Sequence, residues 1–113
     1  MRLRPTLAAA VGALTLLVAL PGQASAAEGT FSYVYHDLEG DQRVGRLVDP
    51  ESRECITLRE AAWEFVPPAH TPRNMTNSSA TVFTDVDCEG DHYTLRIGGL
   101  GSERLKLRSV VFS

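Results

Sequence analysis

Residues 1–26 limit how much of this chain can take part in its fold. Two arginines, Arg2 and Arg4, precede an uncharged, mostly apolar run over residues 7–20. A positive segment followed by a short apolar one is typical of a secretory signal peptide. The run is shorter than the about 20 residues that a membrane-spanning helix needs. We therefore expect export of the chain and removal of this segment.

A cleavage site follows the apolar run. Ala24 and Ala26, on either side of Ser25, place small residues at the two positions that signal peptidase reads. Cleavage after Ala26 leaves residues 27–113, a length that suits one small domain. The sequence thus predicts a single secreted, extracellular domain that has no membrane partner after cleavage.

Residues 27–113 are acidic. Loss of Arg2 and Arg4 leaves 9 of the 11 basic side chains against all 14 acidic ones, a net charge of about −5. A negative domain disfavours nucleic acid and anionic lipid as partners, because both are negatively charged themselves. Arginine also far outnumbers lysine, since Lys106 is the only lysine. That bias is typical of a GC-rich genome and, beside the signal peptide, indicates an actinobacterial source. The alternative is that arginine is used for its bidentate pairing.

The sequence contains two cysteines, Cys55 and Cys88. An even pair in a small exported domain predicts one disulfide. There is no C-x-x-C pair, which redox and zinc sites commonly use. Closing a loop of about 33 residues is worth about 3.5–4 kcal/mol in the chain-entropy model. The disulfide is therefore expected to be a large part of the stability of so small a domain.

Alternating apolar and polar residues, interrupted by turn residues, predict short β-strands along the chain. On one of them Tyr93, Leu95 and Ile97 share a face. Strands at such spacing favour a sandwich or a small barrel, so the expected fold class is all-β. The predicted strands cover residues 31–35, 42–48, 54–58, 80–84, 92–97 and 105–112.

The middle of the chain is less regular. Residues 59–65 could form one helical turn, or Trp63 and Phe65 could alternate on a strand. Two prolines at 67 and 68 end either structure. Residues 69–79 carry few apolar side chains, so we predict a loop over 67–79.

The aromatic residues and the histidines have simple structural interpretations. Core packing is the simplest role for the aromatic set, and any part of it that proved exposed would be a binding patch. The histidines are expected at exposed loops or strand ends, without the spacing of a metal site, so no metal and no cofactor are predicted. The aromatic set is Phe31, Tyr33, Tyr35, Trp63 and Phe65, and the histidines are His36, His70 and His92.

Residues 80–112 carry the marks of a folded corner between two strands. Phe83, a four-residue gap, Cys88 and then Gly90 fit the spacing aromatic, four residues, aromatic, one residue, glycine, with Cys88 in place of the second aromatic. Ser109 lies in the last strand. This pattern resembles one Greek-key motif of the βγ-crystallin superfamily, and residues 31–66 resemble a degenerate first copy. The resemblance implies a small Greek-key β-sandwich in which Gly90 permits the corner and Ser109 satisfies its backbone.

The resemblance also bears on calcium. Many βγ-crystallins bind this ion through two Asn/Asp residues and a Ser/Thr-Ser pair. Alignment on Ser109 places Arg104, Leu105 and Arg108 where oxygen ligands are needed, so this copy is expected not to bind calcium in the family manner. The acidic turn over 85–91 is expected to be solvated, and a weak calcium site there is the alternative.

The resemblance, together with export, favours a secreted binding or inhibitory module, because relatives include metalloprotease inhibitors and killer-toxin-like proteins. We expect a monomer that is not an enzyme and whose partner is an extracellular protein such as a protease. Inhibition needs a rigid exposed loop, and segment 66–79 is the candidate. One alternative is a structural envelope or matrix protein without a ligand. Another is a small hydrolase, which would need Ser, His and Asp to converge in a pocket.

Overall fold

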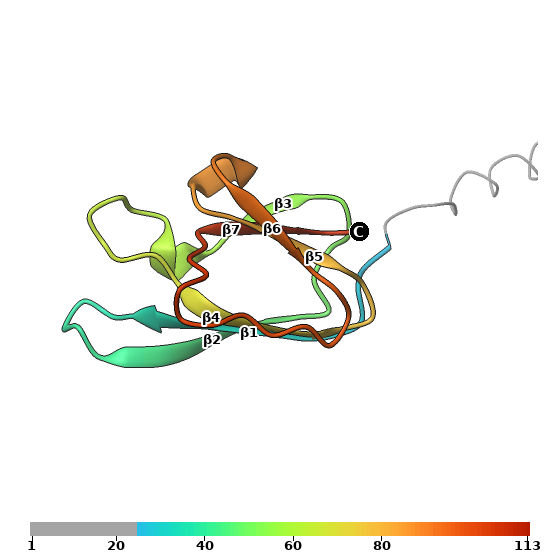
Figure 1. Ribbon diagram of the computed structural model, residues 1–113, viewed down its shortest axis with the longest axis horizontal. Coiled ribbons are helices and arrows are strands. Elements are labelled where there is room, and N and C mark those ends of the chain that lie inside the picture. The colour runs from blue at the N-terminus through green and yellow to red at the C-terminus, as the bar shows by residue number, and fades with distance from the viewer. Residues whose placement is uncertain (1–24) are drawn as a thin grey trace, which may run out of the picture.

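The computed structural model describes residues 25–113 and arranges them as two antiparallel sheets in two layers (Figure 1). The first sheet has the order β2-β1-β4 and the second the order β3-β7-β5-β6. The all-β prediction is therefore confirmed, whereas the predicted signal segment falls almost wholly outside the described residues. The elements are β1 (Gly29–His36), β2 (Gln42–Val48), β3 (Cys55–Thr57), η1 (Arg59–Ala61), β4 (His70–Thr76), β5 (Ala80–Phe83), η2 (Val86–Cys88), β6 (His92–Leu95) and β7 (Ser109–Phe112), η marking a 3-10 turn.

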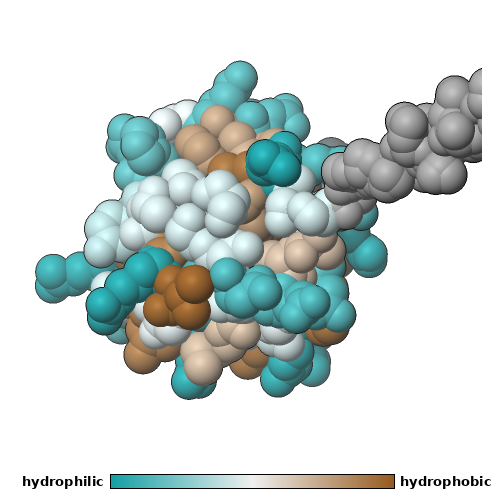
Figure 2. Space-filling view, turned by 90° about the vertical axis from the view of Figure 1, so that its right-hand side faces the viewer, coloured by the Kyte–Doolittle hydropathy of each residue, from teal (hydrophilic) through white to brown (hydrophobic). Residues whose placement is uncertain are grey.

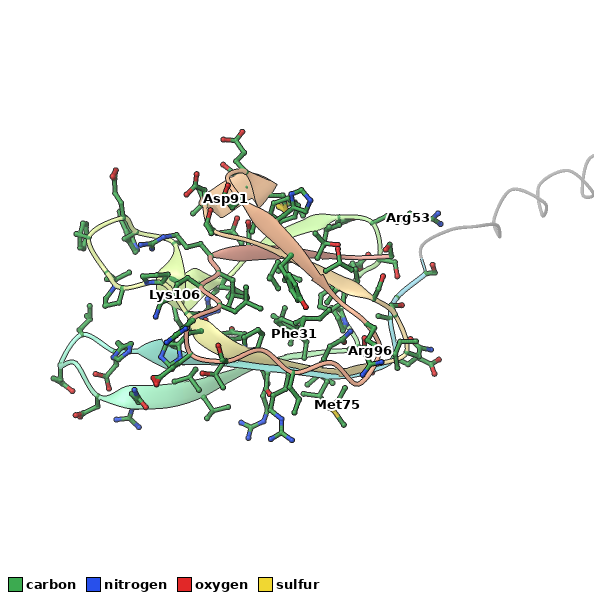
Figure 3. All side chains as sticks on the ribbon, in the orientation of Figure 1. Phe31, Arg53, Met75, Asp91, Arg96 and Lys106 are labelled. Atoms are coloured by element: carbon green, nitrogen blue, oxygen red, sulfur yellow. A yellow bond between two sulfur atoms is a disulfide. The ribbon has the colours of Figure 1, made fainter. Side chains whose placement is uncertain are left out.

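The core lies between the two layers, where Phe31 is seen in Figure 3. On β1, Phe31 and Tyr33 face inward and are buried, as their alternation predicts. The ring of Phe31 meets that of Phe112 on β7 edge to face, with centroids 5.4 Å apart. Val82 and Leu58 belong to the same buried cluster. Each such buried side chain contributes about 1.5–3 kcal/mol, so this cluster is the main support of the sandwich.

Each sheet takes most of its strands from one half of the chain, residues 25–76 or residues 77–113, and one segment from the other half. Strand β3 belongs to the first half but pairs with β7, through Cys55 opposite Val111. Residues 98–102 belong to the second half but run beside β4, where Leu100 bridges Arg73. The backbone nitrogen of Asn74 donates to the carbonyl of Gly99 at 2.9 Å in the same place. The two sheets are therefore tied together by backbone pairing as well as by the core.

The predicted disulfide is present. Cys55 on β3 is bonded to Cys88 on η2, with the two Cα atoms 5.9 Å apart. Because β3 comes from the first half and η2 from the corner between β5 and β6, the bond fixes an exchanged strand to the other half of the chain.

The predicted loop over 67–79 is wrong for residues 70–76, which form strand β4. The strand has the period of two that a half-buried strand requires, with alternate residues buried. Its buried positions, however, hold His70, Pro72, Asn74 and Thr76 rather than aliphatic residues. Because polar side chains occupy the inner face, the strand lacks the apolar alternation by which strands are predicted.

Four predicted strands are shorter than expected; β3 covers 55–57 rather than 54–58, and β5 covers 80–83 rather than 80–84. Strand β6 ends at Leu95, and of the three residues expected on one face only Leu95 is buried. Tyr93 and Ile97 are more than half exposed. The last strand covers 109–112 rather than 105–112, although Leu107 before it is fully buried.

Among residues 25–113, no helix is long and apolar enough to cross a membrane.

Candidate functional site

An exposed aromatic loop follows η1 and covers residues 62–68. The side chains of Trp63 and Phe65 are 62% and 79% exposed, so the prediction that both are core residues is wrong. Their rings lie 5.7 Å apart. The loop projects at the end of the sandwich where the β1–β2 hairpin also turns (Figure 1). Leu38 in that turn is 91% exposed, so three large apolar side chains face solvent at this end.

Arg108 fixes the shape of the 62–68 loop. Its Nη1 donates to the carbonyl oxygens of Ala61 at 3.0 Å and Trp63 at 2.9 Å, and its Nη2 donates to that of Val66 at 2.9 Å. The Val66 amide also donates to the Trp63 carbonyl at 3.0 Å. A planar guanidinium that binds three carbonyls restricts the backbone on both sides of the aromatic pair. The loop is therefore preorganised although its side chains are exposed.

The base of the loop is attached to the core. The hydroxyl of Tyr33 on β1 donates to Oε1 of Glu60 at 2.8 Å, and the neighbouring Ala61 is fully buried. Burial, and then the hydrogen bond to Glu60, raises the pKa of Tyr33 far above its usual value. The phenol thus stays protonated and keeps donating to the carboxylate. Sequence reasoning placed Tyr33 in the core but gave no sign of this link.

Two hollows flank the loop. One, of about 260 Å³, lies between the loop and the β1–β2 turn and is lined on its apolar side by Tyr35, Leu38, Trp63 and Val66. The other, of about 400 Å³, lies between the loop and the corner after β5, where Glu64, Asp85 and Glu89 line it together with Arg108. The aromatic loop thus projects between a largely apolar hollow and a mixed one, in which three carboxylates and Arg108 stand beside Ala62 and Val86.

Carboxylates gather in the β1–β2 turn. Among residues 25–113, only Asp37, Glu39 and Asp41 bring three oxygen ligands within 4.8 Å of one another. The carboxylate of Asp37 accepts from the amides of Glu39 and Asp41 and from Nε of Arg43. The Arg43 hydrogen bond is the main reason that the pKa of Asp37 is lowered. These contacts explain the cluster as a capped turn. The acidic residues of the predicted 85–91 alternative do not come together in this way.

The predicted corner residues do meet. The hydroxyl of Ser109 donates to the carbonyl of Asp85 at 2.6 Å and accepts from the amide of Cys88 at 2.8 Å. Gly90 has a φ of +87°, and a Cβ there would collide with the side chains of Thr84 and Asp85. Phe83 is the partner of Ser109 in the β5–β7 register. The corner holds Asp85 and Glu89 in place, and these two residues line the hollow beside Arg108.

The residues of the predicted cleavage site are described in part. Ala24 lies outside the described residues. The carbonyl of Ser25 accepts from the amide of Ser52 at 3.0 Å, and Ala26 forms a bridge with Glu51. Ala27 is buried. The residues on both sides of the predicted scissile bond therefore contact the sandwich.

Among residues 25–113, no histidine belongs to a group of three metal-ligating side chains. His36 and His70 have ring centroids 5.5 Å apart, whereas the ring of His92 lies tilted beside that of Phe83 with centroids 5.8 Å apart. His70 is only 6% exposed, so its expected exposed position is wrong. Its Nδ1 lies 2.7 Å from the hydroxyl of Thr71. Burial, and then the positive charge of Lys106, lowers the pKa of His70.

Comparison with known proteins identifies no family for the chain. No family model matches it, and no curated protein and no solved structure is significantly similar to it.

Proposed function

We propose that this chain is a secreted, monomeric binding module that presents the 62–68 loop to a cleft in an extracellular protein. The observation that carries the proposal is the combination of two exposed aromatic side chains with a backbone fixed by three Arg108 hydrogen bonds. Aromatic residues are enriched at protein interfaces because they bury much surface at low entropic cost. A preorganised loop also loses little conformational freedom on binding.

The inhibitory form of this function fits the loop better than the predicted segment 66–79. Half of that segment is strand β4, whose buried side chains cannot enter an enzyme cleft. The 62–68 loop projects at one end, between two hollows, and Pro67 and Pro68 restrict its C-terminal side. We therefore propose inhibition of an extracellular protease through Trp63 and Phe65, by binding and not by catalysis.

We also propose that the fold is a pair of Greek-key motifs of the βγ-crystallin kind. Three features support this finer assignment. The two halves exchange one segment each between the sheets. Glycines with similar positive φ, Gly40 at +89° and Gly90 at +87°, lie in the turns after β1 and β5. Ser109 bonds the backbone of the second corner.

A panel of purified secreted proteases of the serine, cysteine, aspartic and metallo classes tests the inhibitory function. We expect the purified protein to inhibit one class at micromolar concentration or below. W63A and F65A should each weaken that inhibition at least tenfold. Y93A is the matched control, because Tyr93 is an exposed aromatic residue on β6, outside the loop. Absence of inhibition in every class would overturn the inhibitory form, and inhibition unchanged in W63A/F65A would exclude this loop.

A further inference from the structure

The outer face of the β2-β1-β4 sheet carries positive charge, although the domain as a whole is acidic. Side chains that point away from the core alternate with Phe31 and Tyr33, so Ser32 on β1 faces outward. The register places Arg46 of β2 and Arg73 of β4 on either side of Ser32. Both arginines are exposed. With strands about 4.8 Å apart, the two backbones are separated by about 10 Å.

Nothing on this face neutralises the two arginines. Among residues 25–113 the one ion pair joins Arg43 to Asp37, in the β1–β2 turn. The outward positions of the three strands beside the arginine row hold no acidic residue. Like charges in one cross-strand row are unfavourable. An oxyanion placed over Ser32 would reverse that interaction, since guanidinium groups and a hydroxyl are donors suited to phosphate or sulfate oxygens.

Exposed apolar side chains surround the arginine row. Val44 lies on one side of it, Val48 and Met75 lie on the other, and Leu100 continues the row beyond Arg73. These four are 52–66% exposed and are among the nine large hydrophobic residues that are exposed in residues 25–113. Figure 3 shows Met75 below the sheet, on the side opposite Phe31. The end of the molecule seen in Figure 2 also has apolar areas interspersed with hydrophilic side chains.

We propose that this face binds the surface of an anionic phospholipid bilayer. The arginines and Ser32 would contact headgroup phosphates, and the four apolar side chains would enter the interfacial layer. A hydrophilic polyanion would use the arginines but would leave the apolar side chains without a role. The net charge of about −5 disfavours anionic lipid, but the charge on this one face is opposite in sign. The face is separate from the 62–68 loop, so the inference does not depend on protease inhibition.

Cosedimentation with vesicles tests the proposal. The purified protein would be mixed at low salt with vesicles of phosphatidylglycerol and phosphatidylcholine, and with vesicles of phosphatidylcholine alone. We expect binding only to the anionic vesicles. R46Q and R73Q should each weaken it by about fivefold and the double variant by about 25-fold, because each arginine near an anionic surface adds about one such step. M75S should weaken it as well.

R53Q is the matched control, since Arg53 is also an exposed arginine but lies away from the β2-β1-β4 sheet (Figure 3). Each variant should keep the thermal midpoint of the parent, because all the substituted side chains are exposed. Failure to bind anionic vesicles would overturn the proposal. So would equal binding by the R46Q/R73Q variant, or arginine-dependent binding to dextran sulfate or pyrophosphate that M75S leaves unchanged and that is tighter than binding to vesicles.

Discussion

The 62–68 loop and strand β4 are neighbours in sequence and opposites in structure. The loop carries the apolar residues Trp63 and Phe65 and exposes them. The strand carries His70, Asn74 and Thr76 and buries them. In both segments hydrogen bonds, rather than hydropathy, fix the backbone: Arg108 binds the carbonyls of the loop, and Asn74 binds those around the strand. Polar side chains can therefore place a segment of this small domain against its own hydropathy.

The largest expected effect is that of N74A on the strand. Asn74 is fully buried, its Nδ2 donates to the carbonyls of Ser78 and Arg96, and its Oδ1 accepts from the hydroxyl of Thr76. Removal leaves several buried groups without partners, so we expect a loss of about 3 kcal/mol in the free energy of unfolding. Urea denaturation measures it. M75A is the control, because Met75 is exposed and should change stability by less than about 0.5 kcal/mol.

A smaller loss of stability is expected when the 62–68 loop loses its hydrogen bonds to Arg108. R108A removes all three hydrogen bonds to loop carbonyls, and we expect a loss of about 1–2 kcal/mol. Hydrogen exchange should increase at the amides of residues 62–66 and remain unchanged in β4. If hydrogen exchange rises equally in both segments, the Arg108 hydrogen bonds do not act on the loop alone.

The pH dependence of stability is expected to come from His70 on strand β4 and not from the loop. Burial lowers the pKa of His70 below its ordinary 6.5, with Lys106 and His36 acting in the same direction and Glu103 against them. Below pH 6.5 the unfolded chain therefore binds more protons than the folded one, and stability falls as pH falls toward the folded pKa. We expect the urea midpoint to be lower at pH 5 than at pH 7.5, with a change smaller than that of R108A. H70Q should flatten this dependence, while R108A should retain it.

The smallest effect on stability is expected from the aromatic side chains of the loop. W63A and F65A should each change the free energy of unfolding by less than about 0.5 kcal/mol, since both side chains are largely exposed. A loss above 2 kcal/mol in thermal or urea unfolding would show that these rings pack as core residues. The comparison between loop and strand would then fail.

Much of the fold could be predicted because local chemistry determines it. The β1–β2 hairpin follows from alternation around Gly40, and the disulfide follows from a single pair of cysteines. Strand β4 could not be predicted, because the partners of Asn74 include Leu95 and Arg96, more than 20 positions away. The same holds for the candidate site. Nothing near Trp63 in the sequence indicates that Arg108, 45 positions later, bonds its carbonyl.

The exchange of segments between the two sheets has a consequence for the order of folding. A chain that emerges from its N-terminus presents β3 long before β7, the strand that pairs with it. The edge of β4 likewise stays open until residues 98–102 appear. Both sheets are therefore completed only when residues of the C-terminal half have emerged. Pairing between segments so far apart in the sequence favours slow folding, because a long loop must close before each contact can form.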